Sequence, residues 1–169
     1  GASGIDDAMD TTILFRSPRL SGRCPDAADA PLFDALFGPD MGPARLAVDL
    51  KDWADHGIAP WVLLHAGHAV GVAGFHIGLG QDGLSLSFHF LPEASGQGLA
   101  SEFVQMALDH GTGPLCEDRF FALVEPDNAA SIRILEKAGF AVDRATGNEN
   151  LMRLVVSRPK AARPAPQAV

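Results

Sequence analysis

A glycine-rich run, Gly96-Gln97-Gly98-Leu99-Ala100-Ser101, constrains this 169-residue chain more than any other segment. It follows the alternating apolar run of residues 84–91, which predicts a strand, and it opens the strongly helical residues 102–110. Glycine has no Cβ, so a ligand can approach the backbone closely. The start of a helix leaves N–H groups unpaired, and they attract an anion together with the helix dipole. The run therefore predicts a pyrophosphate-binding turn, although such turns also occur for packing alone.

Composition and charge limit what the chain can be. Its length fits one domain, and 47% apolar residues are enough for a buried core. We expect neither a transmembrane helix nor a secretory signal, because no run of about eighteen apolar residues and no basic segment before an apolar one occurs. The formal charge of −8 argues against a nucleic-acid partner and suits a cationic one.

The cysteines and histidines predict no metal site. Cys24 and Cys116 lie far apart and form no ligand spacing with the six histidines. We interpret them as free thiols in a reducing cytoplasm. His65 and His68 flank an expected hairpin turn and are interpreted as solvent-facing.

The hydrophobic pattern predicts strands and helices that build a mixed α/β sheet. Expected strands cover residues 11–24, 61–64, 70–77, 84–91, 120–124, 140–144 and 150–156, and expected helices cover 26–37, 44–56, 102–110 and 128–138. Gly38-Pro39 should stop the first helix, and Gly139 should close the last one in a left-handed conformation. No early βαβ unit supports a Rossmann fold, and no lysine follows Gly98 as a P-loop requires.

The predicted organisation is a single folded domain over residues 11–156. Residues 1–10 resemble a disordered start or a cloning remnant, and residues 157–169 form a Pro- and Ala-rich tail that we expect to be disordered. Loops are expected at 78–83 and across 145–149.

A second motif begins the predicted helix that follows Glu125-Pro126-Asp127. Asn128 and Ser131 are three residues apart, so both project from one face near the helix N-terminus. One interpretation is a helix cap followed by an ordinary polar residue. The other is a second ligand-binding helix start beside the glycine-rich turn.

The two motifs together resemble the GNAT acetyltransferase superfamily, in particular the branch that contains the ribosomal-protein N-terminal acetyltransferases. Residues 91–102 are similar to its pyrophosphate-binding segment, and residues 128–140 to its second acetyl-CoA segment. The resemblance in element order covers about residues 12–156. It implies an acyl-CoA N-acyltransferase fold of the α+β type, in which helices flank one mixed, mostly antiparallel sheet. One strand would carry a bulge near Phe90 and splay from the next.

The resemblance also implies where acetyl-CoA would bind. The pantetheine arm would bond to the backbone around Phe90 and Leu91, and Asn128 and Ser131 would reach that arm and the thioester sulfur. The pyrophosphate would contact the remaining expected residues, which are Gly96, Gln97, Gly98, Leu99, Ala100 and Ser101. No metal takes part.

The chain departs from the family in its candidate proton-transfer groups. It contains no tyrosine, and Leu135 stands where many relatives have a tyrosine acid. Ser131 is then the candidate acid, or else it only supports the helix start. Glu125 and His89 are candidate bases, although Glu125 also suits a helix N-terminus and His89 also suits a cleft wall.

These expectations define an acetyl-CoA-dependent N-acetyltransferase. The acceptor would be an amine, either a protein N-terminus or a small molecule, which attacks directly in a ternary complex. Residues 38–57 would line the acceptor side, and a homodimer is left open. The alternatives are a non-catalytic CoA-binding module, which regulates or interacts, and an α/β domain with no cofactor.

Overall fold

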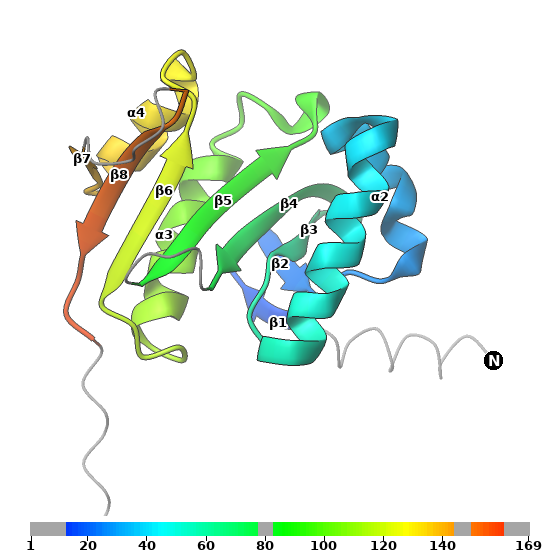
Figure 1. Ribbon diagram of the computed structural model, residues 1–169, viewed down its shortest axis with the longest axis horizontal. Helices are drawn as coiled ribbons and strands as arrows, with labels where there is room; N and C mark the ends of the chain where they lie inside the picture. The colour runs from blue at the N-terminus through cyan, green and yellow to red at the C-terminus, as the bar shows by residue number, and fades with distance from the viewer. Residues whose placement is uncertain (1–12, 78–82, 144–149, 161–169) are drawn as a thin grey trace, which may run out of the picture.

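The computed structural model describes residues 13–77, 83–143 and 150–160, and its centre is an eight-stranded sheet in the order β1-β2-β3-β4-β5-β6-β8-β7 (Figure 1). The strands are β1 (Ile13–Arg16), β2 (Leu20–Arg23), β3 (Trp61–His65), β4 (His68–His76), β5 (Leu84–Phe90), β6 (Arg119–Val124), β7 (Ala141–Asp143) and β8 (Met152–Ser157). The helices are η1 (Ala27–Asp29), α2 (Ala30–His56), η2 (Pro92–Ala94), α3 (Leu99–Thr112) and α4 (Ala129–Lys137). Within the described ranges, no helix has the length and apolar character to cross a membrane.

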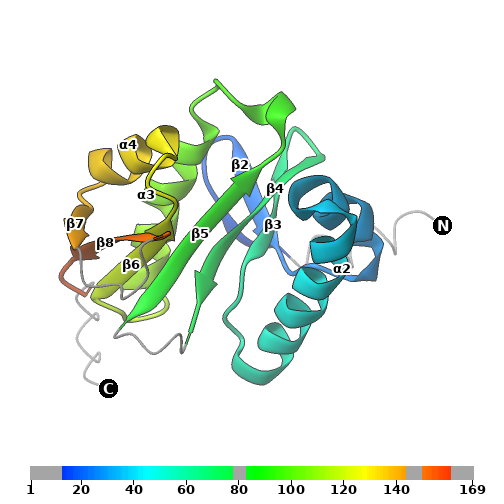
Figure 2. The same cartoon turned by 45° about the horizontal axis from the view of Figure 1, so that its top comes forward.

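The predicted mixed, mostly antiparallel sheet is confirmed. The β5–β6 pair is parallel, and every other strand pair in the described part of the chain is antiparallel. The helices α3 and α4 cover one face of the sheet, and α2 lies across β2, β3 and β4 on the other (Figures 1 and 2). The front of β5 and β6 is left without a covering helix.

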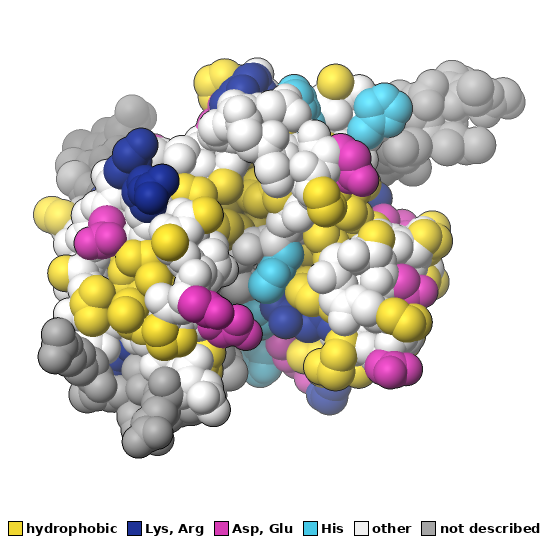
Figure 3. Space-filling view, turned by 90° about the horizontal axis from the view of Figure 1, so that it is seen from above, with side chains coloured by type: hydrophobic (Ala, Val, Ile, Leu, Met, Phe, Trp, Pro, Cys, Tyr) yellow, Lys and Arg dark blue, Asp and Glu magenta, His cyan; other side chains and the backbone are white. Residues whose placement is uncertain are grey.

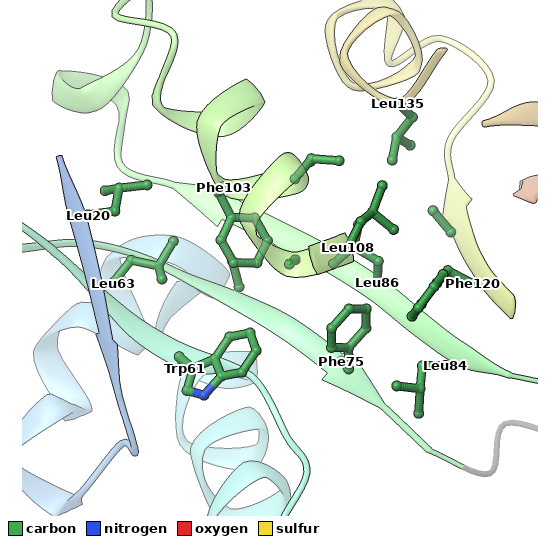
Figure 4. Packing of buried hydrophobic residues seen from close by; sticks show 14 of the residues in the cluster. Leu20, Trp61, Leu63, Phe75, Leu84, Leu86, Phe103, Leu108, Phe120 and Leu135 are labelled. Atoms are coloured by element: carbon green, nitrogen blue, oxygen red, sulfur yellow. The ribbon is translucent and has the colours of Figure 1, made fainter. Parts of the chain in front are cut away.

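Each face has its own hydrophobic core. Phe103 of α3 is fully buried against Trp61 and Phe75, and their rings pack edge to face with Phe15 nearby (Figure 4). The smaller core beneath α2 consists of Phe33, Leu46, Val62 and Val72. The two cores fix the sheet between its helices, which is the scaffold that the site requires.

The segment Ala30–His56 differs from the two separate helices that the sequence predicted. Gly38 has the left-handed φ of 87° and a ψ of 161°, so the helical geometry does break there as expected. The second helical stretch follows at once instead of at Ala44, because Pro39 occupies its first position, where a missing N–H is harmless. Gly139, with φ 101°, closes α4 as predicted.

The splayed strand pair is present. Strands β5 and β6 pair only at Leu84↔Phe120 and Ser85↔Phe121, after which β6 continues to pair with β8. The expected bulge near Phe90 was wrong, because β5 pairs with β4 in one unbroken register up to Phe90. The irregularity lies instead at Val70 of β4, where the β3–β4 register shifts.

The predicted domain boundary needs a small correction at the C-terminal end. Ser157 still belongs to β8, and the Arg158 N–H donates to the Asp118 carbonyl, so the fold extends past residue 156. The expected start at 1–10 and the rest of the tail from 161 lie outside the described residues. So do the turn at 145–149 and all of the loop 78–83 except Gly83.

Truncation of the central aromatic of α3 should destabilise the protein strongly. Phe103→Ala removes a fully buried ring, so we expect the free energy of unfolding to fall by about 3–5 kcal/mol. Met41→Ala, at a 63% exposed position, should change it by less than about 0.5 kcal/mol. Urea unfolding followed by circular dichroism measures both, and equal losses would contradict this description of the core.

Candidate active site

The parting of β5 and β6 opens a cleft of about 330 Å³. Viewed from above, the surface is hollowed between the lobe that carries α4 and the lobe formed by α2 (Figure 3). The walls of the cleft come from three elements and one loop residue: Leu86, Ser87, Phe88 and His89 of β5, Ala122, Leu123, Val124 and Glu125 at the end of β6, Asn128 and Ser131 at the start of α4, and Leu151.

Only some backbone groups of β5 face this cleft. The Leu91 N–H donates to the Val70 carbonyl at 2.8 Å, and the Leu91 carbonyl accepts from the Ala94 N–H at 2.9 Å. Because alternate residues of a strand point their backbone groups to opposite sides, those of Phe88 and Phe90 face the edge that β6 leaves open. Phe90 therefore has free backbone groups for the expected contact with the pantetheine arm, whereas the N–H and carbonyl of Leu91 are already bonded.

The glycine-rich turn lies at the end of this open edge. Gly96 and Gly98 have φ values of 78° and 77°, and Gly98 is the N-cap of α3. Among the described residues, no acceptor is found for the N–H groups of residues 96–101. A Cβ at Gly96 would meet no heavy atom within 4 Å. The turn thus offers a row of unpartnered donors in open space at the positive end of a helix dipole.

A side-chain clamp that the sequence did not predict holds this turn. The Arg19 guanidinium donates to the Gln97 carbonyl at 2.7 Å and to Glu102 Oε1 at 2.8 Å. Ser17 also donates to Glu102, and these hydrogen bonds outweigh the effect of burial, so the pKa of Glu102 is lowered. Arg19 lies 78 residues from Gln97 in sequence, so no local motif signals the contact. The clamp places a cation beside the glycine-rich turn.

Asn128 and Ser131 occupy the predicted helix start. The Asn128 side chain accepts from the Ser131 N–H at 3.2 Å, so it is the N-cap of α4. Both residues also line the cleft, so the cap is compatible with the ligand-binding interpretation, which stays a prediction. Among the described residues, the Ser131 hydroxyl has no hydrogen-bond partner, which leaves it able to donate into the cleft.

The two candidate bases differ in environment. Glu125 is exposed at the end of β6, where its carbonyl accepts from the Asn128 N–H. His89 is partly open to solvent, and the protein covers the rest of its side chain. The centroids of the His89 and Phe37 rings lie 4.8 Å apart. This burial, with the charge of Arg45, lowers the pKa of His89 to about 4. The imidazole is therefore neutral at pH 7 and accepts a proton only weakly.

Comparison with known proteins agrees with this geometry. The model of the acetyltransferase (GNAT) domain matches residues 19–141, so the chain belongs to this family of N-acetyltransferases. A search of curated proteins finds no match.

Solved structures show the same fold at low sequence identity. An acetyltransferase from Agrobacterium tumefaciens is 19% identical with a TM-score of 0.75, over 85% of this chain and 94% of that one. RimL, a ribosomal L7/L12 alpha-N-protein acetyltransferase in complex with coenzyme A, is 17% identical with a TM-score of 0.69, over 86% and 97%. A spermidine N-acetyltransferase from Vibrio cholerae is 15% identical with a TM-score of 0.68, over 83% and 95%.

Adding a side chain at the glycine-rich turn should weaken CoA binding. Gly98→Val places a branched Cβ beside the unpartnered N–H groups, so we expect the affinity for CoA to fall by roughly tenfold or more. Gly57→Val is the control for backbone strain, because Gly57 also has a left-handed φ, of 67°, but lies at the far end of α2. A Cβ at Gly57 meets no heavy atom within 4 Å, whereas one at Gly98 lies 3.5 Å from the Arg19 guanidinium.

Both variants should lose about 1–3 kcal/mol of stability from backbone strain, so only the affinity distinguishes them. Calorimetric titration with CoA measures it. Unchanged affinity in Gly98→Val would remove the turn from the binding site.

Proposed function

We propose that this chain transfers an acetyl group from acetyl-CoA to an amine by direct attack within a ternary complex. The observation that carries the proposal is the open edge of β5, which leads to a turn of unpartnered N–H groups. Such an edge suits the amides of a pantetheine arm, and such a turn suits a diphosphate. Acetyl-CoA supplies the activated acetyl group.

The donor side of the cleft is assigned to backbone groups and to the start of α4. Phe88 and Phe90 offer the strand edge. Asn128 caps α4 with its carbonyl oxygen, so its amide N–H groups are left for the ligand. The turn that would hold the diphosphate consists of Gly96, Gln97, Gly98, Leu99, Ala100 and Ser101, with Arg19 beside it.

Ser131 is the proposed donor to the departing sulfur. Among the described residues its hydroxyl has no hydrogen-bond partner, and Ser131 lines the cleft. The chain has no tyrosine that could take this role. A hydroxyl at the positive end of α4 can hydrogen-bond a developing thiolate, which the helix dipole also stabilises.

Glu125 is the proposed base, acting directly or through a water. An amine must lose a proton before it attacks, because a lysine-type ammonium has a pKa near ~10.4. We prefer Glu125 because its side chain is exposed in the wall of the cleft, whereas the His89 ring packs edge to face against the Phe37 ring. We assign His89 to the wall of the cleft, where Phe37 holds its ring.

The acceptor is proposed to enter from the side of α2. The stretch 38–57 lies on that side, and no helix covers the front of β5, along which a protein N-terminus or a small amine would approach (Figure 1). The acidic net charge of −8 favours the approach of a cationic acceptor. The free thiol of Cys24 suits a reducing cytoplasm.

A CoA-binding module without catalysis is the second candidate, which the absence of a tyrosine acid favours. Release of free CoA thiol separates the two. The enzyme should release thiol from acetyl-CoA when a panel of peptides, polyamines, aminoglycosides and amino acids is supplied. Binding of CoA with no thiol release on any acceptor would support the module, and no thermal shift with acetyl-CoA would contradict both.

Removal of the Ser131 hydroxyl should affect turnover more than binding. Ser131→Ala keeps the N–H that Asn128 caps, so α4 should stay folded. We expect kcat to fall by roughly 10²-fold, with the affinity for CoA nearly unchanged. Ser157→Ala, at the end of β8, is the matched control and should leave both unchanged. An equal loss of turnover and affinity would make Ser131 a binding residue.

A further inference from the structure

A cluster of charged side chains lies between α2 and β4, outside the CoA cleft. Asp49 and Asp52 are three residues apart, so they share one face of α2. His76 ends β4 on the side that α2 covers. One ligand atom from each of these three side chains lies within 4.8 Å of the other two. A helix and a strand thus bring two carboxylates and an imidazole together.

The Asp49 carboxylate is buried and has no hydrogen-bond partner. Its side chain is 0% exposed, and neither oxygen has a hydrogen-bond donor. A buried carboxylate without hydrogen bonds is costly, because no protein donor replaces the water that it loses. Burial accordingly raises the pKa of Asp49 to about 6, although the charge of Arg45 opposes this.

Arg45 compensates the cluster only in part. It donates to His76 Nε2 at 3.2 Å, and its guanidinium carbon lies 4.9 Å from the centre of the Phe37 ring. Its Nε is 3.6 Å from Asp49 Oδ1, too far for a hydrogen bond, and this nitrogen is itself buried without a partner. Arg45 is thus shared between Asp49 and His76, and it satisfies neither oxygen of Asp49 by a hydrogen bond.

We propose that Asp49, Asp52 and His76 bind a divalent metal ion of the zinc class. One imidazole nitrogen and two carboxylate oxygens are an established donor set for Zn²⁺, with bonds of about 2.0–2.2 Å. Donors around such an ion lie roughly 3.5 Å apart, so the side chains must close by about an ångström.

Arg45 must leave the His76 nitrogen when the ion binds. Its side chain is 27% exposed, so it can turn toward the open side of α2. There it stays close enough to hydrogen-bond a ligating carboxylate from outside the coordination shell. The ion would join α2 to β4 and so fix the wall on the acceptor side. The spacing of cysteines and histidines gave no sign of this site, because two of its ligands are carboxylates.

Metal titration of the full chain tests the proposal. Protein stripped with a chelator is titrated with Zn²⁺ by calorimetry and with Co²⁺ by visible absorption. We expect a single ion per chain, a Co²⁺ spectrum of low coordination number, and a rise in thermal stability with Zn²⁺. Asp52→Asn and His76→Gln should each weaken binding by roughly tenfold or more.

Two variants serve as controls. Asp55→Asn alters an exposed carboxylate on the same helix and should leave metal binding unchanged. His68→Gln removes one member of the surface pair His65 and His68, which are register partners across a hairpin. It should also leave the site unchanged.

Three results would overturn the proposal. They are no binding at millimolar Zn²⁺, binding that persists in both Asp52→Asn and His76→Gln, and binding lost in His68→Gln alone. Circular dichroism checks that each variant is folded, and if Asp52→Asn is not, His76→Gln decides the outcome.

Discussion

The separation of β5 from β6 is the constraint on which the rest of this structure depends. The two strands pair at only Leu84 and Ser85 of β5, so the remainder of its edge has no neighbour. An open edge inside a sheet leaves backbone donors and acceptors unsatisfied, which a fold tolerates only if something else satisfies them or the edge is protected. Here the cleft walls enclose it, and α3 and α4 hold the two halves of the sheet together from behind.

The two sides of the cleft use different chemistry. The donor side consists largely of backbone groups, from the edge of β5 to the turn that begins α3, and backbone geometry needs few particular side chains. On the side where we propose that the acceptor enters, α2 and β4 contribute charged side chains, among them Arg45, Asp49 and His76. A site built largely from backbone groups gives a physical reason why the fold can persist at 15–19% identity between this chain and the solved structures.

Two ion pairs between different elements fix the parts of the fold that carry the site. Arg19 and Glu102 attach the turn between β1 and β2 to the start of α3. Arg23 and Asp29 join β2 to the start of α2 through two hydrogen bonds of 2.8 Å, and Asp29 is nearly buried. Partly buried pairs with two hydrogen bonds hold geometry better than exposed ones, because solvent screens them less. The two pairs anchor the N-terminal hairpin, one to the start of α3 and the other to the start of α2.

The sequence by itself determined the elements whose signals are local. These signals act through neighbouring residues, so the elements could be predicted. They are the alternation along residues 84–91, the glycines of the turn, and Asn128 and Gly139 at the two ends of α4. Only the tertiary structure decided which backbone groups of β5 stay open, because Leu91 finds its partners in Val70 and Ala94. The same holds for the Arg19 clamp and the cluster beneath α2. Their members are distant in sequence, and burial and charge act on them only after the chain has packed.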